Sequence, residues 1–125
     1  MARLRTPTQS NVNASIDIRR QLLDRIAELV AAEAALLEEV PNSEPDSYLD
    51  LLSAAIAVDR DIEAALLDMA AAVTLAGVSA HTVSKESGIG TATLTRKCRG
   101  HLTELRGREV GPDPDAPYGW RVVAT

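Results

Sequence analysis

Apolar residues recur at three- and four-residue steps over two long stretches of this chain, and two prolines lie between the stretches. This spacing lines up the apolar side chains along one face of an α-helix. We expect the first helix to begin at Ser15, a suitable N-cap, and to end before Pro41, because a residue before proline is driven out of the helical conformation. Glu33 interrupts the main row, which argues against a perfect two-stranded zipper. The main row is Ile18, Leu22, Ile26, Leu29, Leu36 and Val40, and an adjoining row is Leu23, Val30 and Leu37.

The second stretch predicts a second long helix. Ser47 and Asp50 resemble a capping box, with Asp in place of the usual Glu or Gln. The helix can run to about Ala76, where Gly77 is a natural stop. A straight helix of this length would span ~43 Å, and a kink around Val58–Asp61 is the alternative. Its apolar face is Leu49, Leu52, Ile56, Ile62, Leu66, Met69 and Val73.

The composition favours helices over sheets. Phenylalanine is absent and aromatic residues make up 2% of the chain, so the core has to be built from Leu, Ile, Val and Ala, which suits closely packed helices. A strand is expected only near residues 121–123. The apolar rows are wider than two helices can cover, so we expect a homodimer through residues 15–77. In the alternative, a monomer, the hairpin folds back on the C-terminal helices.

Charge is segregated along a chain whose formal net charge is −5. Residues 1–25 carry +3 and residues 26–77 carry −10, whereas residues 78–108 carry +4 and residues 109–125 carry −2. An acidic segment between two basic ones indicates that the segments have different functions, because the acidic part would repel DNA and the basic parts would attract it.

A third region, after Gly77, has the features of two short helices joined by a tight turn. Ser79 can cap a helix over residues 80–87, and Gly88 allows the positive φ that such a turn needs. A further helix opens at Thr91, with Gly90 as its N-cap. We expect Val83, Ile89, Leu94 and Cys98 to point inward, with Cys98 acting as a small buried hydrophobe rather than as a redox sensor.

The segment GVSAHTVSKESGIGTATLTRKCRG, residues 77–100, resembles the helix-turn-helix of bacterial and phage DNA-binding proteins. The resemblance covers about a fifth of the chain and implies a recognition helix that begins at Thr91. It departs from the family at Lys97, which stands at a usually apolar position, and at Gly90, which replaces a more common Ser or Thr. An ordinary helix pair is the structural alternative, but three threonines lower helix propensity without any structural benefit.

The resemblance also implies which side chains meet DNA. Those that would project toward bases are Thr91, Ala92, Thr95, Arg96 and Arg99. Arg96 is the candidate for a guanine edge, and Ala92 for a thymine methyl group. The candidates for phosphate contacts are Ser79, His81, Thr82, Lys85 and Lys97.

The two ends of the chain are expected to be irregular. Residues 1–14 predict a flexible basic arm, whose Arg3 and Arg5 are candidates for DNA contact. Residues 109–125 are rich in Pro and Gly and predict an irregular tail. Tyr118 and Trp120 in this tail can dock on the body or on a protein partner. The expected fold is therefore all-α: a long antiparallel hairpin over 15–77, whose second helix also supports the helix-turn-helix over 78–108, followed by the tail.

The sequence contains no recognisable enzyme or cofactor motif. Cys98 is the only cysteine, and His81 and His101 lie twenty residues apart, so neither a disulfide framework nor a metal site is expected. No apolar run approaches the ~20 residues of a membrane span, and we expect a cytoplasmic protein.

The function that we expect is that of a dimeric transcriptional regulator or phage-type repressor that binds double-stranded DNA. Abundant arginine and alanine are compatible with a bacterial or phage source. One alternative is a small terminase-like DNA-packaging subunit, although there the helix-turn-helix commonly comes first in the chain. The other is a helical adaptor that binds proteins and not DNA.

Overall fold

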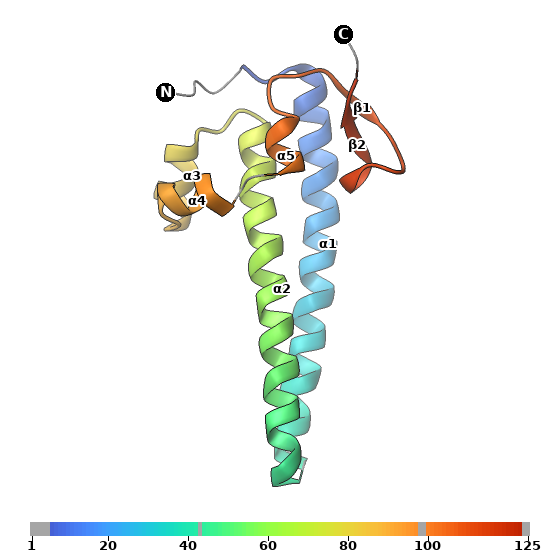
Figure 1. Ribbon diagram of the computed structural model, residues 1–125, viewed down its shortest axis with the longest axis vertical. Helices are drawn as coiled ribbons and strands as arrows, with labels where there is room; N and C mark the ends of the chain where they lie inside the picture. Colours follow the sequence, from blue (N-terminus) through green and yellow to red (C-terminus); the bar gives the residue numbers. More distant parts are fainter. Residues whose placement is uncertain (1–5, 43, 98–99, 124–125) are drawn as a thin grey trace. The chain divides into compact units, whose positions relative to one another are not determined.

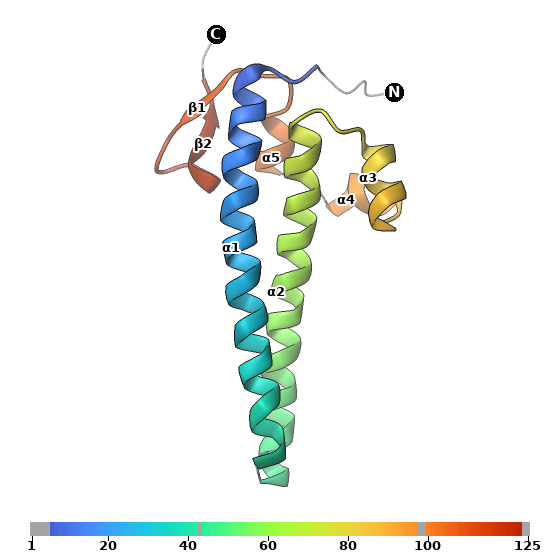
Figure 2. The same cartoon turned by 180° about the vertical axis from the view of Figure 1, so that it is seen from behind.

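The computed structural model describes residues 6–42, 44–97 and 100–123, most of which are helical. Two long helices dominate it, α1 (Gln9–Glu39) and α2 (Tyr48–Leu75). Two short 3-10 turns join them, η1 (Val40–Asn42) and η2 (Pro45–Ser47). The helices lie side by side and run in opposite directions (Figures 1 and 2). The long helical hairpin that the apolar spacing predicts is therefore present.

The chain divides into two compact units. Unit 1 comprises Met1–Gln21 and Leu67–Thr125, and unit 2 comprises Leu22–Leu66. Both long helices contribute to both units. Unit 2 consists only of the facing segments of α1 and α2 with η1 and η2 between them, whereas unit 1 holds all the other elements that the structure describes.

Helix α1 begins earlier than the sequence predicts. It starts at Gln9 and not after Ser15, so the prediction of a flexible arm is wrong for residues 9–14, while residues 1–5 lie outside the described residues. The reason is a cap at Thr8: its Oγ1 accepts from the Asn11 N–H at 3.0 Å, and the Asn11 Oδ1 accepts from the Thr8 N–H at 3.2 Å. This is a reciprocal capping box with Asn in the place of Glu or Gln.

The Asn11 side chain is fully buried and joins segments that are almost a hundred residues apart. Its Nδ2 donates to the carbonyl oxygens of Leu105 at 2.9 Å and Arg108 at 2.8 Å. Its Oδ1 also accepts from the Gly107 N–H at 2.8 Å. One amide thus binds three backbone groups of the turn that follows the last short helix.

Helix α2 is continuous from Tyr48 to Leu75, so the straight alternative holds and the kink does not. Helix α2 begins at Tyr48, directly after Ser47, so the predicted start of the second helix is confirmed, while Ser47 itself is the last residue of η2. Ser15, predicted as an N-cap, is instead buried within α1, where its Oγ donates to the Ala72 carbonyl at 2.5 Å. Gly77 has a φ of +107° and lies two residues after the end of α2, so the predicted helix stop is confirmed.

Unit 1 contains three more helices and a small sheet. Figures 1 and 2 show α3 and α4 beside the end of α2, and the sheet beside α1. The elements are α3 (Ala80–Ser87), α4 (Thr91–Lys97), α5 (His101–Glu104), β1 (Val110–Pro112), the 3-10 turn η3 (Pro117–Gly119) and β2 (Trp120–Val122). The core of this unit includes Ile18, Leu75 and Leu105, which are almost completely buried.

The predicted irregular tail is an ordered antiparallel ribbon. β1 pairs with β2 in the register Val110↔Val122, Gly111↔Arg121 and Pro112↔Trp120. Proline is tolerated there because a two-stranded ribbon consists of edge strands, which have free N–H positions. Gly111 is needed for close approach, since a Cβ at this position would lie 2.9 Å from Val123 Cγ1. The strand expected near residues 121–123 is thus present, with an unexpected partner.

Asn11→Ala is expected to destabilise the protein by about 1–3 kcal/mol, because it leaves the Gly107 N–H without its described partner and removes the amide donor of the Leu105 and Arg108 carbonyls, which keep only their bonds from the Arg108 N–H and Thr8 Oγ1. Asn13→Ala is the matched control: this side chain is exposed and its Oδ1 accepts only from Gln9 Nε2 among the bonds described. It should change the free energy of unfolding by less than about 0.5 kcal/mol. Urea denaturation followed by circular dichroism measures both, and equal losses would contradict the prediction.

Candidate nucleic-acid interface

The helix pair, α3 with α4, is shaped by its local hydrogen bonds. Ser79 caps α3, since its Oγ accepts from the Thr82 N–H at 3.1 Å. At the other end Gly88 is left-handed, with φ +78°, and its N–H donates to the Ser84 carbonyl at 2.9 Å. Both the cap and the glycine stop were predicted, and they fix α3 at eight residues.

Serine hydroxyls hold the turn between the two helices. Ser84 Oγ donates to the Ile89 carbonyl at 2.6 Å, and Ser87 Oγ accepts from the Ile89 N–H at 3.1 Å. Then α4 opens with a bond from the Leu94 N–H to the Gly90 carbonyl at 3.0 Å. This role of Ser84 was not predicted from the sequence. The available signal is a serine five residues before Ile89, on the other side of the glycine turn.

A small apolar core joins the helix pair to the end of α2. Ala70 of α2, Val83 of α3 and Leu94 of α4 are buried together, with Val73 and Ile89 packed against them. The inward positions predicted for Val83, Ile89 and Leu94 are therefore confirmed. Cys98, the fourth predicted inward residue, lies outside the described residues.

The predicted base-facing residues occupy the outer side of α4 as far as the structure describes them. Thr91, Ala92 and Arg96 are exposed, on the first and second turns of the helix. Thr95 belongs to α4, but its side chain is outside the description, and so is all of Arg99. The exposed part of α4 thus offers the methyl group of Ala92, the guanidinium group of Arg96 and the hydroxyl group of Thr91, which also donates to Ser84 Oγ at 3.4 Å.

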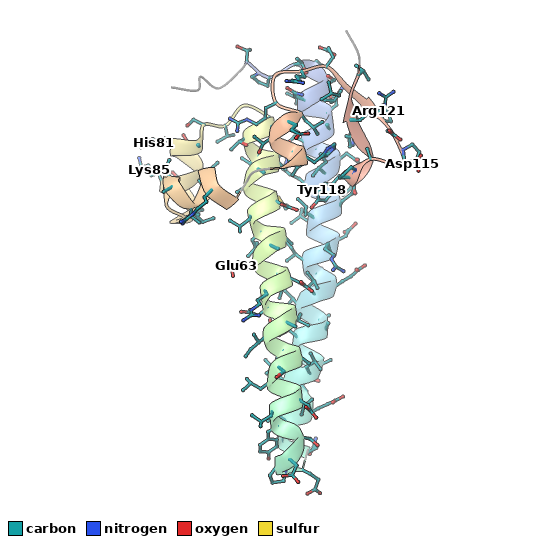
Figure 3. The ribbon with its side chains drawn as sticks, viewed as in Figure 1. Glu63, His81, Lys85, Asp115, Tyr118 and Arg121 are labelled. Carbon is teal, nitrogen blue, oxygen red and sulfur yellow. The ribbon has the colours of Figure 1, made fainter. Side chains whose placement is uncertain are left out.

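The predicted phosphate contacts come mainly from α3. His81, Thr82 and Lys85 are exposed, and Figure 3 shows His81 and Lys85, one helical turn apart, along one side of α3. Ser79 is half-buried, and its hydroxyl donates to Thr82 Oγ1 at 2.9 Å, so both hydroxyls are engaged at the cap and have less freedom to bind a phosphate than His81 and Lys85. The Lys97 side chain is outside the description.

A second polar cluster attaches the C-terminal ribbon to the long helices. Trp120 Nε1 donates to Asp17 Oδ2 at 2.8 Å, and the Tyr118 hydroxyl donates to Asp68. Gln21 Nε2 donates to the Tyr118 carbonyl at 2.9 Å. Both aromatic residues are half-buried, and Figure 3 shows Tyr118 close to α1. The tail therefore docks on its own chain, which removes the main reason to predict a protein partner at Tyr118 and Trp120.

The same cluster shifts one titration. The indole N–H of Trp120 lowers the pKa of the Asp17 carboxyl below its ordinary value of 3.8. Partial burial works in the opposite direction, and Gln21 and Arg20 add smaller lowering effects. A lowered carboxyl pKa stabilises the folded state above the ordinary pKa, and this contribution is lost as the pH falls through the folded-state value.

Other kinds of site find little support among the described residues. They contain no group of three His, Cys, Asp or Glu side chains that could hold a metal ion. Among the helices described, none has the length and apolar character to cross a bilayer. An open depression is lined by Ala35, Glu38 and Glu39 of α1 and by Asn42 of η1, which are adjacent along the chain.

Comparison with known proteins finds no matching family model, no matching curated protein and no matching solved structure.

Gly88→Ala is expected to destabilise the protein by about 1 kcal/mol, because alanine is strained at φ +78° although a Cβ would meet no atom within 4 Å. Gly90→Ser is the control: its φ is ordinary, its nearest contact would be Thr93 Oγ1 at 3.9 Å, and serine suits the N-cap of a helix. This second change should stay within about 0.5 kcal/mol of wild type. Thermal unfolding compares them, and a Gly90 effect as large as the Gly88 effect would contradict the backbone argument.

Trp120→Phe is expected to make the free energy of unfolding less dependent on pH at acidic pH. Above pH ~5 the variant should be less stable than wild type by a constant amount, because its Asp17 carboxylate lacks the indole donor. The gap should narrow as the pH falls below 3.8, where the wild-type advantage is titrated away. Urea titrations at several pH values measure this difference in the free energy of unfolding between variant and wild type. In an Asp17→Asn background the same change should leave no pH-dependent gap, and a persistent one would assign the effect elsewhere.

Proposed function

We propose that this chain is a sequence-specific DNA-binding protein that uses α4 as its recognition helix and works as a homodimeric transcriptional regulator or phage-type repressor. The observation that carries the proposal is the helix pair itself. Two short helices meet at a left-handed glycine, share a core with the end of α2, and leave the outer side of α4 exposed. In a helix-turn-helix the second helix enters the major groove with its N-terminal residues next to base edges.

The chemistry of α4 supports base contacts. A guanidinium group such as that of Arg96 can donate two parallel hydrogen bonds to a guanine edge, and a methyl group such as that of Ala92 can contact a thymine methyl. Thr91 supplies a hydroxyl on the same exposed side. By the helix-turn-helix resemblance Thr95 and Arg99 would complete this set.

The chemistry of α3 supports phosphate contacts. His81, Thr82 and Lys85 are exposed on the helix that would cross the DNA backbone. Lys97 would add a positive charge and Ser79 a hydroxyl. In sequence, residues 78–108 carry a net charge of +4 within an acidic chain, so the attraction to DNA is concentrated in this segment.

A homodimer through residues 15–77 follows from two observations. One helix pair neutralises only a few phosphates, so a single copy would bind weakly at physiological salt. In unit 2 the exposed large apolar side chains also outnumber the buried ones. The buried set is Leu22 and Leu29, and the exposed set is Leu23, Val30, Leu37, Tyr48, Leu49, Leu52, Ile56 and Leu66. Such a surface fits burial against another protein chain.

A regulator of this kind binds and does not catalyse, and it acts where bacterial or phage DNA is, in the cytoplasm. Oligomeric state and DNA affinity distinguish this function from the two competing ones. A closed ring of many copies on DNA would instead indicate a packaging subunit. A dimer without affinity for any DNA would indicate a protein-binding adaptor.

The proposal is tested by selecting bound fragments from random double-stranded DNA and titrating the selected site at fixed salt. Arg96→Ala should weaken binding to that site ~5- to 150-fold, the worth of a bidentate base contact, with little effect on unrelated DNA. Lys85→Ala should weaken binding to both DNAs and lower the salt dependence by about one counterion. Arg60→Ala, which removes an exposed arginine of α2, is the charge-matched control. Failure to select any sequence, or equal effects of Arg96→Ala and Arg60→Ala, would sink the proposal.

A further inference from the structure

The outer flank of α1 in unit 2 carries an apolar row that the hairpin does not use. Leu23, Val30 and Leu37 lie seven residues apart and are 61%, 50% and 53% exposed. Their neighbours Leu22 and Leu29 are buried on the hairpin's inner face. Because one residue corresponds to a 100° turn of the helix, the exposed row lies about 100° from the inner face. The contact within the hairpin therefore leaves it uncovered.

Two alanines complete this row as a heptad pattern. Ala27 and Ala34 are also exposed and fall between the larger residues, which gives the order Leu23, Ala27, Val30, Ala34, Leu37, with alternating steps of four and three. This alternation is the signature of a helix that packs along its length against another helix. We call these five residues the α1 seam. It contains no charged residue, although eleven acidic and two basic residues lie in unit 2.

We propose that the α1 seam is the contact with a second copy of this chain, and that the two α1 helices pair antiparallel about a two-fold axis between Glu28 and Leu29. The proposal rests on the dimer of the proposed function, but it does not require that this dimer bind DNA. It specifies which face of residues 15–77 makes the contact, and in which orientation.

Side-chain size favours the antiparallel orientation. In this register Leu23 of one copy lies opposite Ala34 of the other, and Ala27 lies opposite Val30. Each large side chain then faces an alanine, so the four central layers have similar volumes and can pack evenly. In a parallel, in-register pair, Val30 would face Val30 and Ala27 would face Ala27, which makes layers that are alternately crowded and empty.

Charge favours the same orientation. All the basic residues of α1 lie between residues 19 and 25, namely Arg19, Arg20 and Arg25, with Asp17 and Asp24 near them. Residues 26–39 carry only acidic charges, Glu28, Glu33, Glu38 and Glu39. A parallel pair would set the acidic ends against each other. An antiparallel pair places Arg20 of one copy next to Leu37 and Glu38 of the other, where its stem can cover the leucine and its guanidinium can reach the carboxylate. Antiparallel pairing thus offsets part of the repulsion between two acidic units.

The contact is tested by sedimentation equilibrium of the full chain without DNA. Val30→Glu should raise the dimer dissociation constant ~100-fold, because two copies of the substitution enter one apolar contact. Ala57→Glu is the matched control: Ala57 is exposed on α2, outside the seam and outside the exposed set of large apolar side chains, and its replacement should change the constant less than about twofold. Circular dichroism of both variants establishes that the helices still form. A monomeric wild type, or a loss with Ala57→Glu in place of Val30→Glu, overturns the proposal.

The orientation is tested by disulfide cross-linking in a Cys98→Ser background. A mixture of Leu23→Cys chains and Ala34→Cys chains should give a cross-linked dimer on oxidation, because these positions face each other in the antiparallel register. Neither chain should cross-link efficiently by itself. Efficient self-cross-linking of the Leu23→Cys chain would mean a parallel pair and overturn the assignment. Since neither measurement uses DNA, a failure of the seam and a failure of DNA binding give separate results.

Discussion

The last turns of α2 are enclosed on two sides, and the arrangement of unit 1 depends on this close packing. Ala70 faces the core of the helix pair, while Ala72, completely buried, accepts the hydrogen bond of Ser15 from α1. Residues two apart on a helix point to nearly opposite sides, so one alanine serves each neighbour. Larger side chains at these positions would push the neighbours apart. The helix pair is therefore oriented by a helix that is itself fixed by α1.

Buried polar groups join parts of unit 1 that are distant in the sequence. Asn11 binds the loop after α5, and Ser15 binds α2, across separations that no local structure spans. Within the described chain, no buried side-chain nitrogen or oxygen lacks a partner. Because an unpaired buried polar group costs more free energy than a paired one returns, these bonds specify one arrangement rather than add much stability. The DNA-binding surface proposed for α4 gains its fixed geometry from this specificity.

The sequence predicted what depends on local pattern and missed what depends on distant partners. The two long helices, the Gly77 stop, the Ser79 cap and the turn at Gly88 all follow from periodicity or from the conformational needs of single residues. The early start of α1 was missed because Asn11 acts where Glu or Gln is usual. The ribbon was missed because Pro and Gly dominate its composition, while its order comes from pairing and from contacts with α1 and α2. The candidate DNA contacts were proposed from a resemblance, and the described residues among them are exposed or, for Ser79, half-buried.

The order of the units along the chain has a consequence for folding. The chain leaves unit 1 after Gln21 and returns to it at Leu67, so unit 2 is in effect an insertion. Unit 1 forms only when these two points meet, and closing such a loop costs conformational entropy. A helical hairpin closed by a short turn brings them together by contacts between neighbouring segments, in the manner of a zipper. Its length could then change by whole heptads without altering unit 1, which makes unit 2 the part of this protein that is most open to variation.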